Sequence, residues 1–173
     1  MYNKYLDEIK ALEVMIHLTK STNDVFHLMK VLYYAEKLHL ERYQQSIYGD
    51  YFVKMEDGPV PSGAYDIVKC ARGEESKYDR RIKELHPENA FYFIDNNTLI
   101  PVREPRLEYL SESDIECLND ANTQYGQMEP YKLWRTVHNE IAYQRAVLNK
   151  PISNEKILLS LPNGVEVMKY LTE

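Results

Sequence analysis

The 173-residue sequence predicts an α+β fold that is predominantly α-helical: a helical bundle with a small antiparallel β-sheet, made of a strand near 51–55 and a hairpin near 91–102. Apolar residues recur at helical spacing towards both ends of the chain, whereas short apolar runs bounded by Gly, Pro, Asn and Asp lie in the middle. The sequence has no internal repeat, low-complexity run or flexible linker. We therefore expect a single domain over residues 1–173, large enough to bury roughly 70% of the surface of its unfolded chain.

The first helix is expected from about Tyr2 to His17. Its apolar positions recur at helical spacing: Tyr5, Ile9, Leu12 and Ile16. Ser21 and Asp24 have the spacing of a capping box, and Thr22 is a competing N-cap, so a second helix should begin here.

The second helix, "DVFHLMKVLYYAEKLHLERYQQ", has the strongest helical pattern in the sequence. A wide apolar arc follows it: Val25, Leu28, Val31, Leu32, Ala35 and Leu38. So wide an arc predicts a central helix with neighbours on more than one side. His27 and His39 on this helix are expected to be structural residues.

A rigid segment, "DGPVP" from Asp57 to Pro61, follows the strand that is expected over Tyr51–Met55. Glycine allows a tight turn, and proline fixes φ and donates no hydrogen bond. We expect this corner to end the strand and lead into a helix capped by Ser62. The same corner would suit a surface for a partner, and both interpretations stay open.

The predicted hairpin joins residues 91–94 to residues 98–102 through Asp95, Asn96 and Asn97, which tolerate turn conformations. A lone hairpin is marginal in water, so it should pair with the strand at 51–55 or lie on helices.

The last third of the sequence is expected to be helical again. Ser111 and Asp114 have capping-box spacing, and Gly126 can end that helix. Pro130 suits the first turn of the next helix, and Ser153 caps a final segment.

Composition argues against several classes of protein. The net charge is −6, and the basic residues at 72–83 alternate with acidic ones, so we expect no nucleic-acid partner. There is no signal-like N-terminus and no apolar run long enough for a bilayer, so we expect a cytoplasmic protein without membrane contact. Cys70 and Cys117 are expected to be buried free thiols. No metal, nucleotide or other cofactor motif occurs, so no cofactor is expected.

Catalytic motifs are also missing, and we expect no enzymatic activity. The nearest acid–base pair is His138 and Glu140 in "TVHNE". Residues two apart face different sides of a helix, so these two would cooperate only if the helix breaks there. A structural histidine bonded to the backbone or to a tyrosine is the favoured interpretation.

Four groups of residues resemble the Panacea, or SocA-like, antitoxin domain family. They are the Lys-x-Leu-Tyr-aromatic-Ala pattern, the Gly-Pro-Val corner with a following tyrosine, the Leu-Ser-x-x-Asp start and the His-x-Glu end before an aromatic residue. In this chain they read as Lys30, Leu32, Tyr33, Tyr34 and Ala35; Gly58, Pro59, Val60 and Tyr65; Leu110, Ser111 and Asp114; His138, Glu140 and Tyr143. The sequence departs from the family at Met55 and Asp57, which are often aromatic, and at Val137, where threonine is usual.

The resemblance implies a mostly helical domain with a small antiparallel sheet, and an antitoxin in a toxin–antitoxin system. Such a protein would neutralise a cognate toxin by direct binding, and members of the family occur in phages and mobile elements. Two alternatives stay open: a proteolytic adaptor that delivers a toxin to an AAA+ protease, and a phage-encoded modulator of a host protein.

The candidate protein-binding residues combine the rigid corner with the aromatic residues near the motifs. A preorganised surface lowers the ordering cost of binding. The candidates are Tyr33, Tyr34, Asp57, Gly58, Pro59, Tyr65 and His138.

Overall fold

The computed structural model describes residues 5–75, 77 and 79–173. Its elements follow in the order α1 (Glu8–Thr19), α2 (Val25–Tyr43), β1 (Phe52–Met55), β2 (Gly58–Pro61), α3 (Ser62–Ala71), α4 (Arg80–Glu84), the 3-10 helix η1 (Pro87–Asn89), β3 (Phe91–Asp95), β4 (Thr98–Pro101), the 3-10 helix η2 (Leu107–Tyr109), α5 (Glu112–Tyr125), α6 (Pro130–His138), α7 (Ile141–Gln144), α8 (Asn154–Leu159) and α9 (Gly164–Thr172). The predicted fold class, α+β and predominantly helical, is confirmed.

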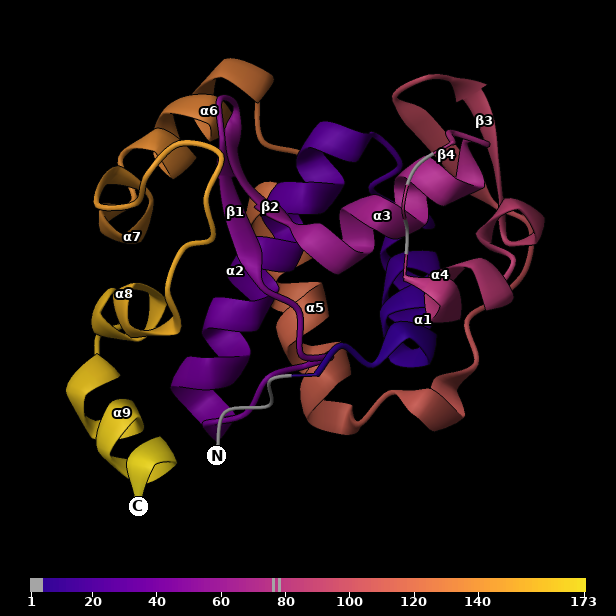
Figure 1. Ribbon diagram of the computed structural model, residues 1–173. Helices are drawn as coiled ribbons and strands as arrows, with labels where there is room; N and C mark the ends of the chain where they lie inside the picture. The colour runs from indigo at the N-terminus through magenta and orange to yellow at the C-terminus, as the bar shows by residue number, and fades with distance from the viewer. Residues whose placement is uncertain (1–4, 76, 78) are drawn as a thin grey trace.

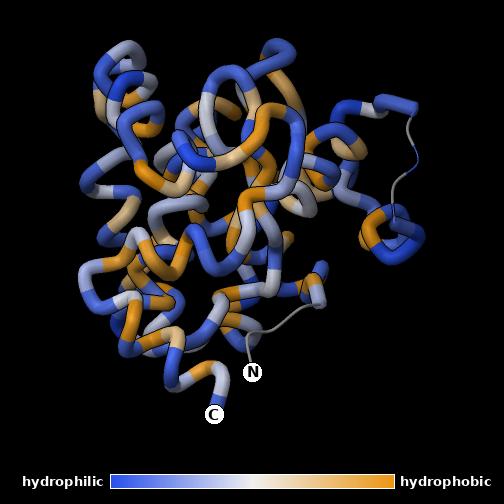
Figure 2. The backbone as a smooth tube through the Cα atoms, turned by 60° about the vertical axis from the view of Figure 1, so that its left-hand side comes forward, coloured by the Kyte–Doolittle hydropathy of each residue, from blue (hydrophilic) through white to orange (hydrophobic). Residues whose placement is uncertain are grey.

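Helix α2 is the centre of the fold, as its wide apolar arc predicts. It packs most extensively against α5 and β2 and also contacts α1, α3, α6, α8 and α9. Figure 1 shows α2 running through the middle of the molecule with the β1–β2 hairpin beside it. Along the tube in Figure 2, hydrophobic and hydrophilic stretches alternate, as expected for helices that bury one side.

Both N-terminal helices begin later than the sequence suggests. Helix α1 starts at Glu8, because the Asp7 side chain accepts a hydrogen bond from the Lys10 backbone N–H at 3.0 Å. Tyr5 precedes the helix and is 79% exposed, and the predicted start at Tyr2 lies outside the described residues. The N-cap of α2 is Asp24, not Ser21 or Thr22, because its carboxylate accepts from the His27 N–H at 2.9 Å.

The Gly-Pro corner is itself a strand, which corrects the prediction of a simple turn. Strand β2 pairs antiparallel with β1, Phe52 opposite Pro61 and Met55 opposite Gly58, so that Glu56 and Asp57 form the turn. Successive residues of a strand point their backbone N–H positions in opposite directions, so the two prolines, which are two residues apart, face the same way. The Ser62 N–H donates to the Tyr51 carbonyl at 2.9 Å, which places the prolines at positions that face away from β1. No ladder hydrogen bond is lost there.

Helix α3 is capped from a distance, not by Ser62 as expected. The buried Asp50 carboxylate accepts from the N–H groups of Gly63 at 2.8 Å and Ala64 at 2.9 Å, while Ser62 is the first helical residue. Burial raises the pKa of Asp50 to about 6, although these backbone bonds act in the opposite direction. Asp50 therefore fixes the end of the hairpin to the start of α3.

The second hairpin, β3–β4, forms where the sequence predicts it, but it does not pair with β1. It lies against the loop between α1 and α2, where the Val25 N–H donates to the Asn97 carbonyl at 2.8 Å and the Leu99 N–H donates to the Asn23 carbonyl at 2.9 Å. The strands thus form two separate two-stranded antiparallel sheets.

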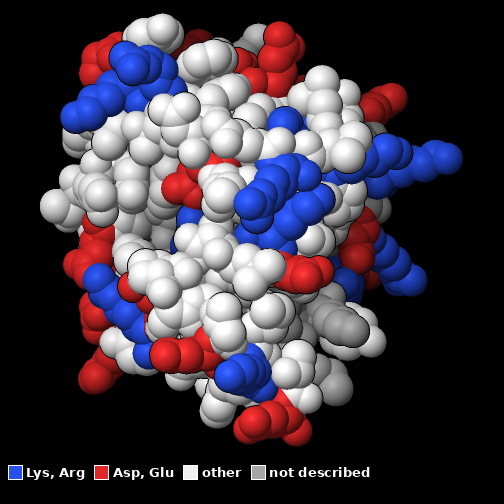
Figure 3. All heavy atoms as spheres, turned by 90° about the vertical axis from the view of Figure 1, so that its left-hand side faces the viewer, with Lys and Arg blue, Asp and Glu red and all other residues white. Residues whose placement is uncertain are grey.

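The start signals in the last third of the chain are confirmed. Ser111 and Asp114 form a complete capping box on α5, Pro130 occupies the first turn of α6, and Ser153 caps α8. Gly126 is the C-cap of α5. On the face that carries α6 to α9, charges of both signs are scattered among wide uncharged areas (Figure 3). Within the described residues, no helix has the length and apolarity needed to cross a bilayer.

Candidate functional site

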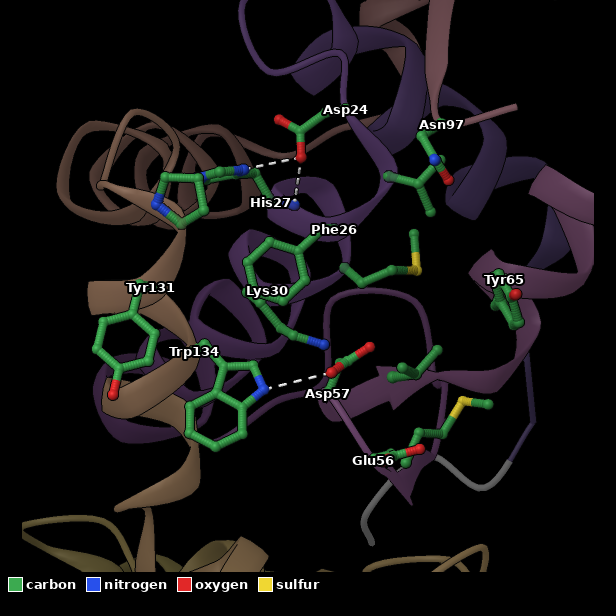
Figure 4. A pocket seen from close by; sticks show the side chains of 15 residues that line it. Asp24, Phe26, His27, Lys30, Glu56, Asp57, Tyr65, Asn97, Tyr131 and Trp134 are labelled. Carbon is green, nitrogen blue, oxygen red and sulfur yellow. Dashed lines mark hydrogen bonds and ion pairs between the residues drawn. The ribbon is translucent and has the colours of Figure 1, made fainter. Parts of the chain in front are cut away.

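An open groove lies between the N-terminal half of α2, the β1–β2 hairpin, α3 and α6 (Figure 4). Its volume is about 1060 Å³. Its walls are mainly apolar and aromatic, and they include Phe26, Met29, Met55, Val60, Tyr65 and Trp134. A groove of this size accommodates several side chains of a partner.

Lys30, on α2, forms the floor of this groove. The residue is only 2% exposed, and its ammonium donates to the Pro59 carbonyl at 3.2 Å. The ammonium also lies 5.2 Å from the centre of the Phe26 ring. Burial lowers the pKa of Lys30 to about 8, and the negative charge of Asp57 offsets only part of that effect.

The turn of the β1–β2 hairpin is fixed to α6 and α7 by side chains. The two ring nitrogens of His138 face the carbonyl oxygens of Trp134 at 2.6 Å and Glu56 at 2.7 Å. The Tyr143 hydroxyl donates to the Met55 carbonyl at 2.6 Å. The turn is therefore held in place before any partner arrives.

Three aromatic rings on α6 stack along this edge of the groove. The Tyr131 and Trp134 rings are 6.1 Å apart at an interplanar angle of 8°, and Trp134 lies 3.7 Å from the His138 ring. The Trp134 indole N–H donates to the Asp57 carboxylate at 3.3 Å. Tyr131, at the outer end, is 64% exposed and offers its ring to the surroundings.

The opposite end of the groove is fixed by His27. One ring nitrogen lies 2.8 Å from the Asp24 carboxylate and the other 2.6 Å from the Met128 carbonyl. These contacts join the start of α2 to the segment before α6, so both walls of the groove have defined positions.

Five of the predicted binding residues gather around this groove. Asp57 is exposed in the turn, Tyr65 is half-buried in the wall, and His138 supports the turn from behind. Gly58 and Pro59 are buried, so they shape the site and do not present a surface. Within the corner, Asp57 is thus the exposed residue, and Gly58 and Pro59 are covered.

Gly58 is required by its surroundings. Its φ of +118° is a conformation that side chains rarely adopt, and an added Cβ would lie 2.8 Å from Val137 Cγ2 and 2.9 Å from Lys30 Cε. The glycine lets the hairpin approach α2 and α6 closely.

Tyr33 and Tyr34, two further candidate binding residues, are buried and do not line this groove. Tyr33 is fully buried and packs edge-on against Phe52, and Tyr34 stacks on Tyr125 with the ring centres 3.7 Å apart. Burial raises the pKa of both hydroxyls. Because α2 is covered on several sides, both tyrosines pack in the core of the protein.

Three residues of the site had no role in the sequence-based prediction: Lys30, Trp134 and Tyr131. Lys30 was recognised only as part of a family pattern, although a lysine inside a wide apolar arc is an unusual placement. Trp134 is partly exposed and lines the groove.

His138 and Glu140 do not form a pair, although the helix does break between them. Glu140 instead accepts from the Lys37 ammonium at 2.5 Å, and the His138 ring nitrogens face carbonyl oxygens. His138 thus makes the backbone and tyrosine contacts that the structural interpretation expects. Across the described ranges, no group of three or more His, Cys, Asp or Glu side chains could hold a metal ion.

Comparison with known proteins identifies the family. The family model described as "Antitoxin SocA-like, Panacea domain" matches residues 28–143, about two thirds of the chain. Searches of curated proteins and of solved structures gave no match. The matched segment contains Lys30, the whole β1–β2 hairpin and α6, which build most of the groove. The chain therefore belongs to the SocA-like antitoxin family that carries the Panacea domain.

Proposed function

We propose that this protein neutralises a cognate toxin by direct binding, and that the groove between α2, the β1–β2 hairpin and α6 receives the toxin. The observation that carries the proposal is the groove itself: a wall of partly exposed aromatic side chains next to a turn that is already fixed. Tryptophan and tyrosine are enriched among the residues that dominate binding energy at protein interfaces.

The rigidity of the hairpin turn supports binding by a preformed surface. His138 and Tyr143 hold the backbone of Met55 and Glu56, so the turn need not be ordered when a partner arrives. A surface that is already ordered loses less conformational entropy on binding.

Two tyrosines with equal exposure provide the test. Tyr131 lies at the groove and Tyr170 lies on α9, outside the segment that matches the family, and each is 64% exposed. The toxin is first identified by co-purification from the native host. We expect Tyr131→Ala to weaken its binding about tenfold or more, as removal of an interface tyrosine often does. Tyr170→Ala should leave the affinity unchanged.

Both variants should keep their melting temperature, because each tyrosine is largely in solvent. Equal affinities of the two variants would contradict the placement of the interface. Absence of any toxin that the wild-type protein neutralises would contradict the function itself.

Two observations separate direct binding from the two alternatives: the level of the toxin on co-expression and the identity of the protein that co-purifies. A proteolytic adaptor would make the toxin disappear only in cells that contain its AAA+ protease, so steady toxin levels on co-expression support direct neutralisation. A phage-encoded modulator would co-purify with a host protein that is not toxic.

Our proposal includes further expectations about activity, location and partners. The protein has no enzymatic activity and needs no cofactor. It acts in the cytoplasm, belongs to a toxin–antitoxin system associated with phages, and binds neither nucleic acid nor membranes.

A further inference from the structure

The Lys30 ammonium is incompletely hydrogen-bonded. An ammonium group has three N–H donors. Among the described residues, one acceptor lies within hydrogen-bonding distance, the Pro59 carbonyl at 3.2 Å, and no carboxylate lies within 4.0 Å. A buried lysine is normally paired, so this arrangement leaves donors available at the floor of the groove.

The fold shields this charge from solvent. Lys30 is 2% exposed, and burial lowers its pKa to about 8. An isolated buried charge is unfavourable, and a charge of opposite sign with good hydrogen-bond geometry reduces that cost. A carboxylate that reaches Lys30 therefore meets donors whose desolvation is complete.

The walls around Lys30 specify what must accompany the carboxylate. Phe26 lies beside the ammonium, and Figure 4 shows Lys30 pointing into the space between Trp134 and the β1–β2 hairpin. These walls bury apolar groups well. The complementary ligand is a carboxylate attached to a short apolar or aromatic body.

Carboxylates on the rim act against such a ligand. Glu56 and Asp57 are exposed and Asp24 is partly exposed, and together they would attract a cation. Exposed charges are screened by water and salt, whereas a buried charge is screened much less. We therefore expect a carboxylate at the floor of the groove to be attracted by Lys30 more strongly than it is repelled by the rim.

We propose that Lys30 is the recognition site for an acidic side chain of the toxin, an aspartate or glutamate that has an apolar neighbour. The inference rests on the proposed function, because it names the chemistry that the toxin must bring to the groove. It makes Lys30 a specificity-determining residue and not only a support for the hairpin.

A pair of probes with the same aromatic body and opposite charge tests this inference without the toxin. The probes are 3-phenylpropionate and 3-phenylpropylamine, titrated at pH 7 while the methyl signals of Met29 and Met55 are followed by NMR. We expect 3-phenylpropionate to bind more tightly than the amine. Lys30→Met should weaken the binding of 3-phenylpropionate about tenfold, since a hydrogen bond to a charged group is lost. The exposed Lys150 supplies a matched control, and Lys150→Met should have no effect.

A second measurement needs no variant and therefore does not depend on whether Lys30→Met folds. The pKa of the Lys30 ammonium is measured in the wild-type protein by NMR of the lysine side chain, with and without each probe. A bound carboxylate should raise that pKa and the amine should not. Preference for the amine, or binding of 3-phenylpropionate that leaves the Lys30 pKa unchanged, would overturn the inference.

The outcomes also separate this inference from the proposed function. If Tyr131→Ala impairs toxin binding while 3-phenylpropionate fails to bind, the groove receives the toxin and the role of Lys30 is wrong. If 3-phenylpropionate binds through Lys30 while Tyr131→Ala has no effect on the toxin, the carboxylate site stands and the toxin binds elsewhere.

Discussion

Replacing Lys30 by methionine should change the way in which stability depends on pH. The pKa of Lys30 falls from 10.5 in the unfolded chain to about 8 in the native protein, mainly because of burial. Between these two values the unfolded chain binds more protons than the native protein, so the free energy of unfolding rises with pH. The full difference is about 3 kcal/mol, at about 1.4 kcal/mol for each pKa unit.

Methionine has a similar length and no charge, so it removes this dependence. It also leaves the Pro59 carbonyl without its donor, which costs about 1–3 kcal/mol. At pH 7 the two effects oppose each other, and Lys30→Met should be near neutral or stabilising by up to about 2 kcal/mol. Above pH 10, where Lys30 is uncharged, the same variant should be less stable than the wild-type protein.

The assay is urea unfolding of both proteins at several values of pH between 7 and 10.5. The wild-type free energy of unfolding minus that of Lys30→Met should increase by about 3 kcal/mol across this range. Because other ionisations occur in both proteins, the subtraction removes them. Lys150→Met serves as the exposed control and should give a constant difference. A difference for Lys30→Met that stays flat, or that falls with pH, would refute the reasoning about the buried ammonium.

Three further predictions concern other buried groups. Burial raises the pKa of Glu36 from 4.5 to about 7, so ionisation of this carboxyl destabilises the native protein as the pH rises through this range. In urea unfolding at pH 8, Glu36→Gln should be more stable than the wild-type protein by up to about 3 kcal/mol. This advantage should vanish below about pH 4.5. Gly58→Ala should lower the free energy of unfolding by about 2 kcal/mol or more, because of the positive φ and because the added Cβ would lie too close to Val137. A stability equal to that of the wild-type protein would contradict this account. His138→Ala should increase amide hydrogen exchange around Glu56 and lower the free energy of unfolding by about 2 kcal/mol. The control variant His86→Asn, at an exposed histidine, should change neither quantity.

Local signals explain which parts of the fold could be predicted. The start of α5 depends on Ser111 and Asp114, which are three residues apart and in contact, so the capping box was found correctly. The turn of the β3–β4 hairpin likewise depends on three neighbouring residues. The start of α3 could not be found in this way, because its cap, Asp50, precedes the helix by a whole hairpin.

Strand β2 shows the limit of composition-based reasoning. Gly, Pro and Asp favour turns, and "DGPVP" was therefore interpreted as a corner. Only the register of the hairpin reveals that Pro59 and Pro61 both occupy positions where no N–H is needed. Spacing of two residues between prolines is compatible with an edge strand, and that spacing was the available signal.

The candidate site was predicted in part because a sequence pattern gives the face of a helix but not what covers it. On α2, Tyr33 and Lys30 belong to the same family pattern, yet Tyr33 packs into the core against Phe52 while Lys30 points towards the groove. The difference arises from the hairpin and α6, which reach α2 only after folding. The pattern on α2 therefore includes a core residue and a groove residue, and the sequence alone does not separate them.

The close approach at Gly58 links the shape of the groove to its charge. Lys30 Cε lies 2.9 Å from the place that a Cβ at position 58 would take, so a side chain there would push the lysine stem aside. Val137 limits the same space from α6, and the Pro59 carbonyl accepts a hydrogen bond from the Lys30 ammonium. Gly58 thus permits the tight hairpin and also leaves the space in which the Lys30 ammonium lies beneath the apolar wall of the groove. A sequence that kept Lys30 but lost Gly58 would have to move either the hairpin or the ammonium, and in both cases the floor of the groove would change.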